Sequence, residues 1–132
     1  MTQQKQLIQE VRLLIPNVKL IYLFGSQANG LSNQKSDIDI AVLEPNKIDP
    51  VTRFDIQETL ATKFNKDVDL VDLLSASTVM QNQIIQQGIL LFGDETERCK
   101  FEMQVLSMYQ RLNTERADIL KDYTKWMMSL LT

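Results

Sequence analysis

Two short apolar stretches, separated by a glycine–serine pair and a polar segment, constrain the fold of this chain more than any other feature. Residues 20–24 form the first stretch and lead directly into Gly25 and Ser26, while the second stretch carries Asp37 and Asp39. Short apolar runs that are bounded by turn residues indicate β-strands. Side chains two positions apart in a strand point to the same face, so we expect both carboxylates on one face of a sheet.

These two carboxylates carry like charge, and side by side on a sheet they repel each other. Their placement on a buried sheet costs free energy unless a positive group lies between them, and a divalent cation is the simplest such group. Gly25 lets the backbone turn sharply and approach a ligand closely, and Ser26 can cap a short helix whose free amides suit a phosphate. The stretch therefore predicts a site for metal and phosphate.

The spacing of these residues resembles a known signature. A Gly-Ser pair, ten residues and then Asp-Ile-Asp match the GSx10DxD pattern of the nucleotidyltransferase superfamily related to DNA polymerase beta. The similarity covers roughly the first two-thirds of the chain. For its size, the chain most resembles the minimal nucleotidyltransferase (MNT) antitoxins that are paired with HEPN toxins. This resemblance implies an α/β fold with a mixed sheet flanked by helices.

Relatives in this superfamily place a third carboxylate on the strand next to the Asp-Ile-Asp strand. Residues 66–72 alternate in polarity as a strand does, with Asp67 and Asp69 on the face away from the core. Asp69 lies at the centre of this strand and is the expected third ligand. Asp67 begins the strand and Asp72 ends it with the opposite parity, so both are expected as turn or capping residues.

The resemblance also implies the chemistry. Asp37, Asp39 and Asp69 would hold two Mg²⁺ ions, and Gly25 with Ser26 would hold the triphosphate of ATP. The implied function is that of an antitoxin, a Mg²⁺-dependent protein adenylyltransferase that transfers AMP from ATP to a tyrosine of its cognate HEPN ribonuclease toxin. Two alternatives stay open: a small-molecule nucleotidyltransferase of the aminoglycoside type, and a non-catalytic protein that binds the toxin.

Many relatives carry arginines where this chain has Gln27 and Asn29. Positive charge beside the phosphates would then come from Lys35, from Arg53 or from a partner chain. For Arg53 a plain surface position is the alternative, because arginine side chains are mostly exposed in folded proteins.

The composition excludes several other kinds of site. The 132 residues contain no histidine, which rules out a Ser-His-Asp triad and histidine-ligated zinc within the chain. Cys99 is the only cysteine, so no disulfide can form within the chain. A net charge of −3 argues against a broad basic surface for nucleic acid. Because the N-terminus lacks the apolar segment of a signal peptide and no apolar run could span a membrane, we expect a cytoplasmic protein.

Residues 1–93 are expected to form the nucleotidyltransferase core. Helices are predicted over residues 2–15, 50–64 and 78–87, and a last short strand over residues 89–92. The apolar face of the second helix is expected to comprise Phe54, Ile56, Leu60, Ala61 and Phe64.

Residues 94–132 are expected to form a helical extension, either one long helix or two with a break near residues 113–116. Its apolar residues recur with the spacing of a helical seam, namely Phe101, Val105, Met108, Leu112, Ile119, Tyr123, Trp126 and Leu130. A single helix of this length would extend past a core this small, so we expect its distal half to bind a partner. Tyr123 and Trp126 are the predicted anchors for the HEPN toxin, in a hetero-oligomer.

Overall fold

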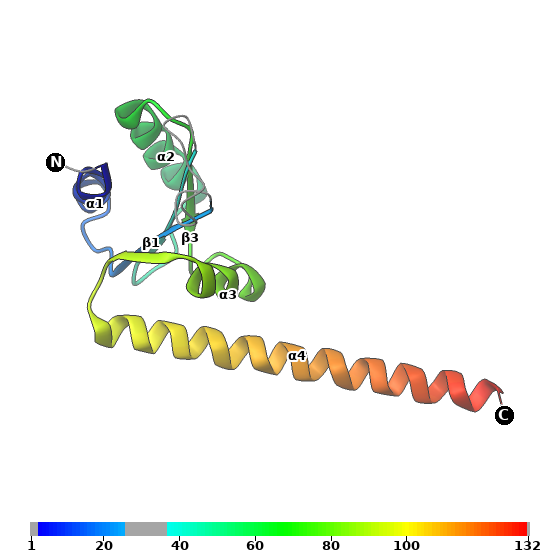
Figure 1. Cartoon of the computed structure of the whole chain (residues 1–132). Helices are drawn as coiled ribbons and strands as arrows, with labels where there is room; N and C mark the ends of the chain where they lie inside the picture. The colour runs from blue at the N-terminus through cyan, green and yellow to red at the C-terminus, as the bar shows by residue number, and fades with distance from the viewer. Residues whose placement is uncertain (1–2, 26–36, 132) are drawn as a thin grey trace.

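A mixed four-stranded sheet forms the centre of the computed structural model, which describes residues 3–25 and 37–131 (Figure 1). The strands are β1 (Leu20–Phe24), β2 (Ile38–Leu43), β3 (Val68–Asp72) and β4 (Ile89–Phe92). They lie in the order β3-β2-β1-β4, with β2 and β4 antiparallel to β1 and with β3 parallel to β2. The predicted mixed sheet is therefore confirmed.

Helices cover both faces of this sheet. They are α1 (Gln3–Leu14), α2 (Pro50–Phe64), α3 (Thr78–Gln87) and α4 (Glu95–Leu131). Alternate residues of the strands face opposite helix pairs. Ile38 and Ile40 of β2 are buried against α1 and α2, whereas Ala41 and Leu43 are buried on the side of α3 and α4. The sheet thus separates two apolar clusters. Successive residues of β1 belong to alternate clusters.

The bounds of α2 and α3 agree with the prediction because their local signals are strong. Asp49 caps α2, and its carboxylate accepts hydrogen bonds from the amides of Val51 and Thr52. Ser77 caps α3 by accepting from the amide of Met80, at 3.1 Å. One detail of α2 was predicted wrongly. Phe54 is 52% exposed, since it lies outside the arc of α2 that packs on the sheet.

A partly buried polar contact joins α4 to the sheet. The hydroxyl of Tyr22 in β1 donates to Glu102 Oε2 at 2.8 Å, and Arg98 Nε donates to the same oxygen at 2.9 Å. Burial and the bond to Glu102 raise the pKa of Tyr22 well above its ordinary value of 10.0. Phe101 and Val105 are buried beside this contact. The first turns of α4 therefore belong to the folded core.

Beyond those turns, α4 leaves the core. It is one continuous helix of 37 residues, about 55 Å long at ~1.5 Å per residue, so the predicted alternative of a break near residues 113–116 is wrong. The Thr114 hydroxyl donates to the carbonyl of Gln110 inside the helix and does not cap a new one. Every residue from 113 to 131 is exposed. Figure 1 shows this half extending past α3 into open space.

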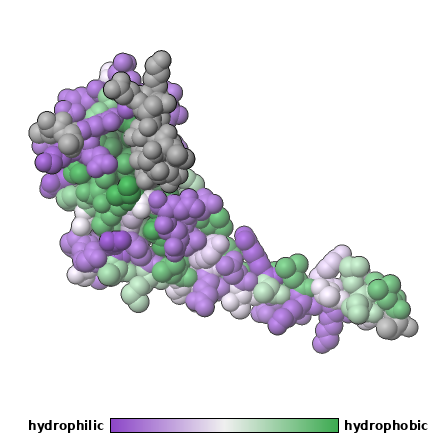
Figure 2. All heavy atoms as spheres, viewed as in Figure 1, coloured by the Kyte–Doolittle hydropathy of each residue, from purple (hydrophilic) through white to green (hydrophobic). Residues whose placement is uncertain are grey.

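Although α4 is long, neither it nor any other helix in the described part of the chain has an apolar stretch that could cross a membrane. Figure 2 shows instead that polar residues separate the apolar surface at the free end of α4 from that of the core. Along the distal half of α4, polar and apolar residues are both exposed to water.

Replacing Tyr22 by phenylalanine tests the contact that holds α4. Tyr22→Phe should lower the free energy of unfolding by about 1.5–3 kcal/mol, because a partly buried hydrogen bond to a charged carboxylate is lost. Tyr123→Phe is the matched control, since that side chain is 56% exposed. It should change stability by less than about 0.5 kcal/mol. Equal stability of Tyr22→Phe and wild type in urea unfolding would show that the bond contributes nothing.

Candidate functional site

The register of the sheet brings the predicted carboxylates together. Asp39 of β2 lies opposite Asp69 of β3 in the parallel pair, and opposite Phe24 of β1 on its other side. Asp37 immediately precedes β2 and shares the parity of Asp39. All three therefore lie at one end of the sheet, on the face that α3 and α4 cover farther along. Asp37 and Asp69 are exposed there, and Asp39 is half-buried.

The carboxylates of Asp37, Asp39 and Asp69 repel one another. Partial burial raises the pKa of Asp39 above its ordinary value of 3.8, and the negative charges of Asp69 and Asp37 raise it further. Carboxylate oxygens that repel each other suit a hard divalent cation, which would remove the repulsion. Within the described residues, no three acidic or cysteine side chains lie close enough together to hold a metal ion. The side chains would have to turn toward one another to share an ion.

Gly25 lies directly beside Asp39 at the end of β1. It has a φ of +73°, which side chains other than glycine rarely adopt, and a Cβ placed on it would overlap the Oδ2 atom of Asp39. Glycine is thus required here for two reasons, the turn and the room for the carboxylate. Ser26, the other predicted phosphate-binding residue, lies outside the described residues, as do Gln27, Asn29 and Lys35.

The other two acidic residues of the β3 segment have different surroundings. Asp72 is only 3% exposed and accepts hydrogen bonds from the Ile48 amide (2.9 Å), the Leu74 amide (3.2 Å) and the Ser75 hydroxyl (2.8 Å). It organises the turn after β3, as its strand parity predicts. Asp67 is exposed just before β3, and its carbonyl accepts a hydrogen bond from the Ile38 amide at 2.8 Å. Asp72 does not belong to the carboxylate group, and the charges that raise the pKa of Asp39 are those of Asp69 and Asp37.

Arg53 is not the plain surface residue that was considered. It is half-buried, and its Nη1 donates to the carbonyl of Leu70 at 3.0 Å and to Gln57 Oε1 at 3.3 Å. Gln57 Oε1 in turn accepts from the Leu70 amide at 2.9 Å. Two α2 side chains thus form hydrogen bonds with the backbone carbonyl and amide of Leu70 at the outer edge of β3. Sequence reasoning missed Gln57, and the one available signal was its position a single helical turn after Arg53.

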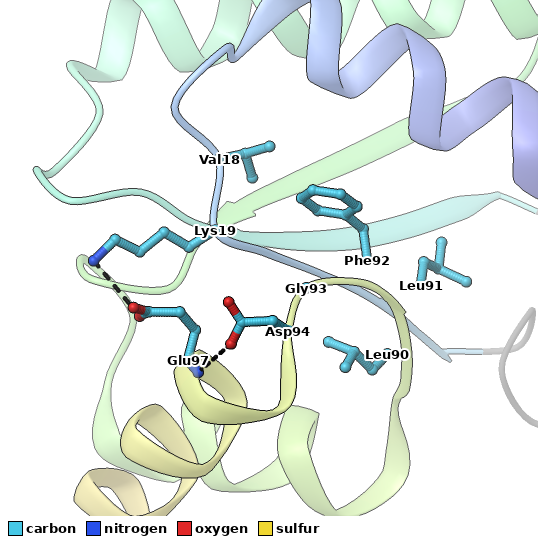
Figure 3. Close-up of a pocket in the computed structure, with 8 residues that line it drawn as sticks. All are labelled: Val18, Lys19, Leu90, Leu91, Phe92, Gly93, Asp94 and Glu97. Atoms are coloured by element: carbon cyan, nitrogen blue, oxygen red, sulfur yellow. Dashed lines mark hydrogen bonds and ion pairs between the residues drawn. The ribbon is translucent and has the colours of Figure 1, made fainter.

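A cavity of about 650 Å³ lies at the opposite edge of the sheet, between β4 and the start of α4 (Figure 3). Lys19 and Glu97 form an ion pair across its rim at 3.6 Å, and the Asp94 carboxylate accepts from the Glu97 amide at 2.8 Å. Lys19 is 40% exposed and Glu97 30%, so solvent weakens the pair. These contacts cap α4 and connect its first turn to the sheet. We therefore interpret this cavity as a structural feature of the contact between α4 and the sheet.

Comparison with known proteins identifies relatives along nearly the whole chain. Residues 5–97 match the family described as Polymerase beta, Nucleotidyltransferase. The protein adenylyltransferase MntA of Shewanella oneidensis is 43% identical over 119 residues, which make up 90% of this chain and 86% of that protein.

Two solved structures resemble this one closely. A toxin–antitoxin crystal structure with AMP-PNP matches with a TM-score of 0.84 and 41% identity, over 93% of this chain and 99% of the other. A structure of the tri-AMPylated Shewanella oneidensis HEPN toxin in complex with MNT antitoxin matches with a TM-score of 0.78 and 40% identity, over 92% and 95%.

Removing the Asp39 charge should stabilise the free protein. The pKa of Asp39 is raised in the folded state, so the ionised carboxylate costs folding free energy above that pKa, and the cost vanishes below pH 3.8, where the group is protonated even when unfolded. Asp39→Asn should therefore melt at a higher temperature than wild type at pH 7, with the difference fading as the pH falls toward 3.8. Asp67→Asn is the control, and its melting temperature at pH 7 should rise by less than that of Asp39→Asn. A melting temperature at pH 7 at or below that of wild type would contradict this electrostatic account.

Proposed function

Because this chain belongs to the polymerase beta nucleotidyltransferase family, we propose that it is an antitoxin that transfers AMP from ATP to a tyrosine of a HEPN ribonuclease toxin and so neutralises it. Identity of 43% to a protein adenylyltransferase supports the reaction, and the likeness to complexes of a HEPN toxin supports the target. The observation that carries the proposal is the alignment of Asp39 with Asp69 beside Gly25.

The reaction divides between two groups of residues. Gly25 and Ser26 would hold the triphosphate of ATP, and Asp37, Asp39 and Asp69 would hold Mg²⁺. When bound, Mg²⁺ neutralises charge on the phosphates and lowers the pKa of the attacking hydroxyl. The tyrosine oxygen attacks the α-phosphorus, the bond to the pyrophosphate breaks, and the phenol proton leaves toward Asp69 and water. Catalysis then rests on positioning and charge neutralisation, because the protein forms no covalent bond itself.

The distal half of α4 supplies a surface for the toxin, and we infer that residues 94–132 form the partner-binding extension. Eighteen residues make five turns of an α-helix. Ile119, Tyr123, Trp126 and Leu130 therefore repeat the directions of Phe101, Val105, Met108 and Leu112. The first two of that earlier set are buried against the sheet, whereas the distal four are each more than half exposed. A partner bound to the distal four residues would lie on the sheet side of α4.

This direction matters for the reaction. Phe101 and Val105 pack on the same face of the sheet that carries Asp39 and Asp69 farther along. A toxin held by the distal residues would therefore lie on the side of α4 that faces the sheet, and its tyrosine would approach the carboxylates from that side. Binding and catalysis would be parts of one surface rather than separate functions of two domains.

Variants of Asp39 and Asp67 test the proposed reaction. With ATP, Mg²⁺ and a HEPN toxin, Asp39→Asn should lower the rate of AMP transfer by about three orders of magnitude or more, because the metal-holding carboxylates act as a unit. Asp67→Asn removes an exposed charge two residues from Asp69 and should change the rate less than about threefold. Intact-protein mass spectrometry of the toxin follows each added AMP. Near-normal transfer by Asp39→Asn would refute the assignment.

A second pair of variants tests the toxin-binding surface. Trp126→Ala should weaken toxin binding by about 2 kcal/mol, or ~30-fold in Kd, since buried tryptophans carry much of the energy of interfaces. Met103→Ala is the control, because Met103 is 70% exposed but lies on the opposite side of α4. Titration calorimetry with the toxin compares the two. Equal affinities for both variants would place the interface elsewhere.

A further inference from the structure

A second cavity, of about 290 Å³, lies outside β3, between the first turns of α2 and α3. Its apolar lining residues include Ile48, Pro50, Ala76 and Met80, and its charged lining residues are Arg53, Asp69 and Asp72. We propose that this cavity receives the acceptor side chain, a phenol ring whose hydroxyl meets Asp69. The inference rests on the proposed transfer of AMP to a tyrosine, and it assigns the place from which that tyrosine attacks.

The order of the strands supports this position for the acceptor side chain. Gly25 ends β1 on one side of Asp39, and the cavity lies beyond Asp69 of β3 on the other side. Displacement at phosphorus runs in line, so the attacking oxygen and the leaving group lie on opposite sides of the α-phosphorus. With the triphosphate at Gly25, the pyrophosphate leaves on the β1 side. The acceptor must therefore approach from the β3 side, where the cavity lies.

The walls of the cavity suit a ring with a single polar tip. Proline and aliphatic side chains flank a ring without demanding hydrogen bonds, and the Met80 thioether makes favourable contacts with aromatic edges. Asp72 also borders the cavity, but its oxygens already accept from Ile48, Leu74 and Ser75. Asp72 is therefore not the partner of an incoming hydroxyl group. A phenol needs only one partner, which Asp69 provides.

Arg53 is held in position for this role. Its bonds to the Leu70 carbonyl and to Gln57 fix the guanidinium at the cavity wall, although Arg53 is only half-buried. A fixed guanidinium can stack on an aromatic ring and favours negative charge on a nearby oxygen. As the tyrosine oxygen attacks, the phenol proton passes to Asp69, the bond between the α-phosphorus and pyrophosphate breaks, and the aryl phosphodiester forms. Arg53 is thus a positioning residue for the acceptor.

Filling the cavity tests the proposal. Met80→Trp puts an indole into the space for the phenol and should raise the KM for the HEPN toxin about tenfold or more, with the Kd for ATP unchanged. Ala76→Leu fills the cavity from another wall and should act in the same direction. Met103→Trp makes the same methionine-to-tryptophan change on an exposed side of α4, outside the cavity, and should leave both constants at their wild-type values. Circular dichroism establishes which variants are folded, and either folded cavity variant decides the question.

The outcomes separate this inference from the function on which it rests. If wild type transfers no AMP to the toxin, the proposed function fails. If wild type is active and a folded cavity variant keeps the wild-type KM for the toxin, the acceptor lies elsewhere and only this inference is overturned. A parallel rise in the Kd for ATP would also overturn it, because the cavity would then hold the base of the nucleotide.

Discussion

Repulsion between Asp39 and Asp69 is the constraint around which the rest of the structure is arranged. Parallel pairing of β2 with β3 sets the two carboxylates side by side, and Gly25 has no side chain to push Asp39 away. Partial burial, and then the nearby charges of Asp69 and Asp37, raise the pKa of Asp39, so the ionised carboxylate costs folding free energy. That cost persists only because the apolar residues of three adjacent strands fix the register. The stable sheet thus holds a group of carboxylates whose repulsion a bound cation would reduce.

The two faces of the sheet differ in what covers them. One face packs against α1 and α2 and supplies most of the core, while the other is covered by α3 and the first turns of α4 and leaves its carboxylate end open. Tyr22, Glu102 and Arg98 fix α4 to that second face. The direction of the exposed distal residues then follows from helical geometry alone, because five turns separate them from Phe101 and Val105. A single continuous helix therefore connects the proposed toxin-binding surface to the site.

Sequence patterns predicted the elements well where the signals are local. Ser77 and Gly88 bounded α3, and strand parity distinguished Asp69 from Asp72. The choice of Asp69 over Asp67 stays a prediction, because the two residues have the same strand parity. Contacts between distant residues could not be predicted in this way. Tyr22 and Glu102 are 80 positions apart, and Arg53 meets Leu70 only after α2 has folded across the edge of β3. The continuity of α4 was also ambiguous, because a threonine such as Thr114 can either cap a helix or bond within one.

Anomalous diffraction from Mn²⁺ tests the central claim, that the aligned carboxylates form the transfer site, most directly. The protein would be crystallised with its HEPN toxin, Mn²⁺ and an ATP analogue whose α–β bridge is a methylene group, so that no transfer occurs. We predict anomalous peaks bonded to oxygens of Asp39 and Asp69, with the triphosphate at the Gly25 turn. Peaks held by Asp67 or by acidic residues of α4, with Asp39 and Asp69 free of metal, would contradict the account.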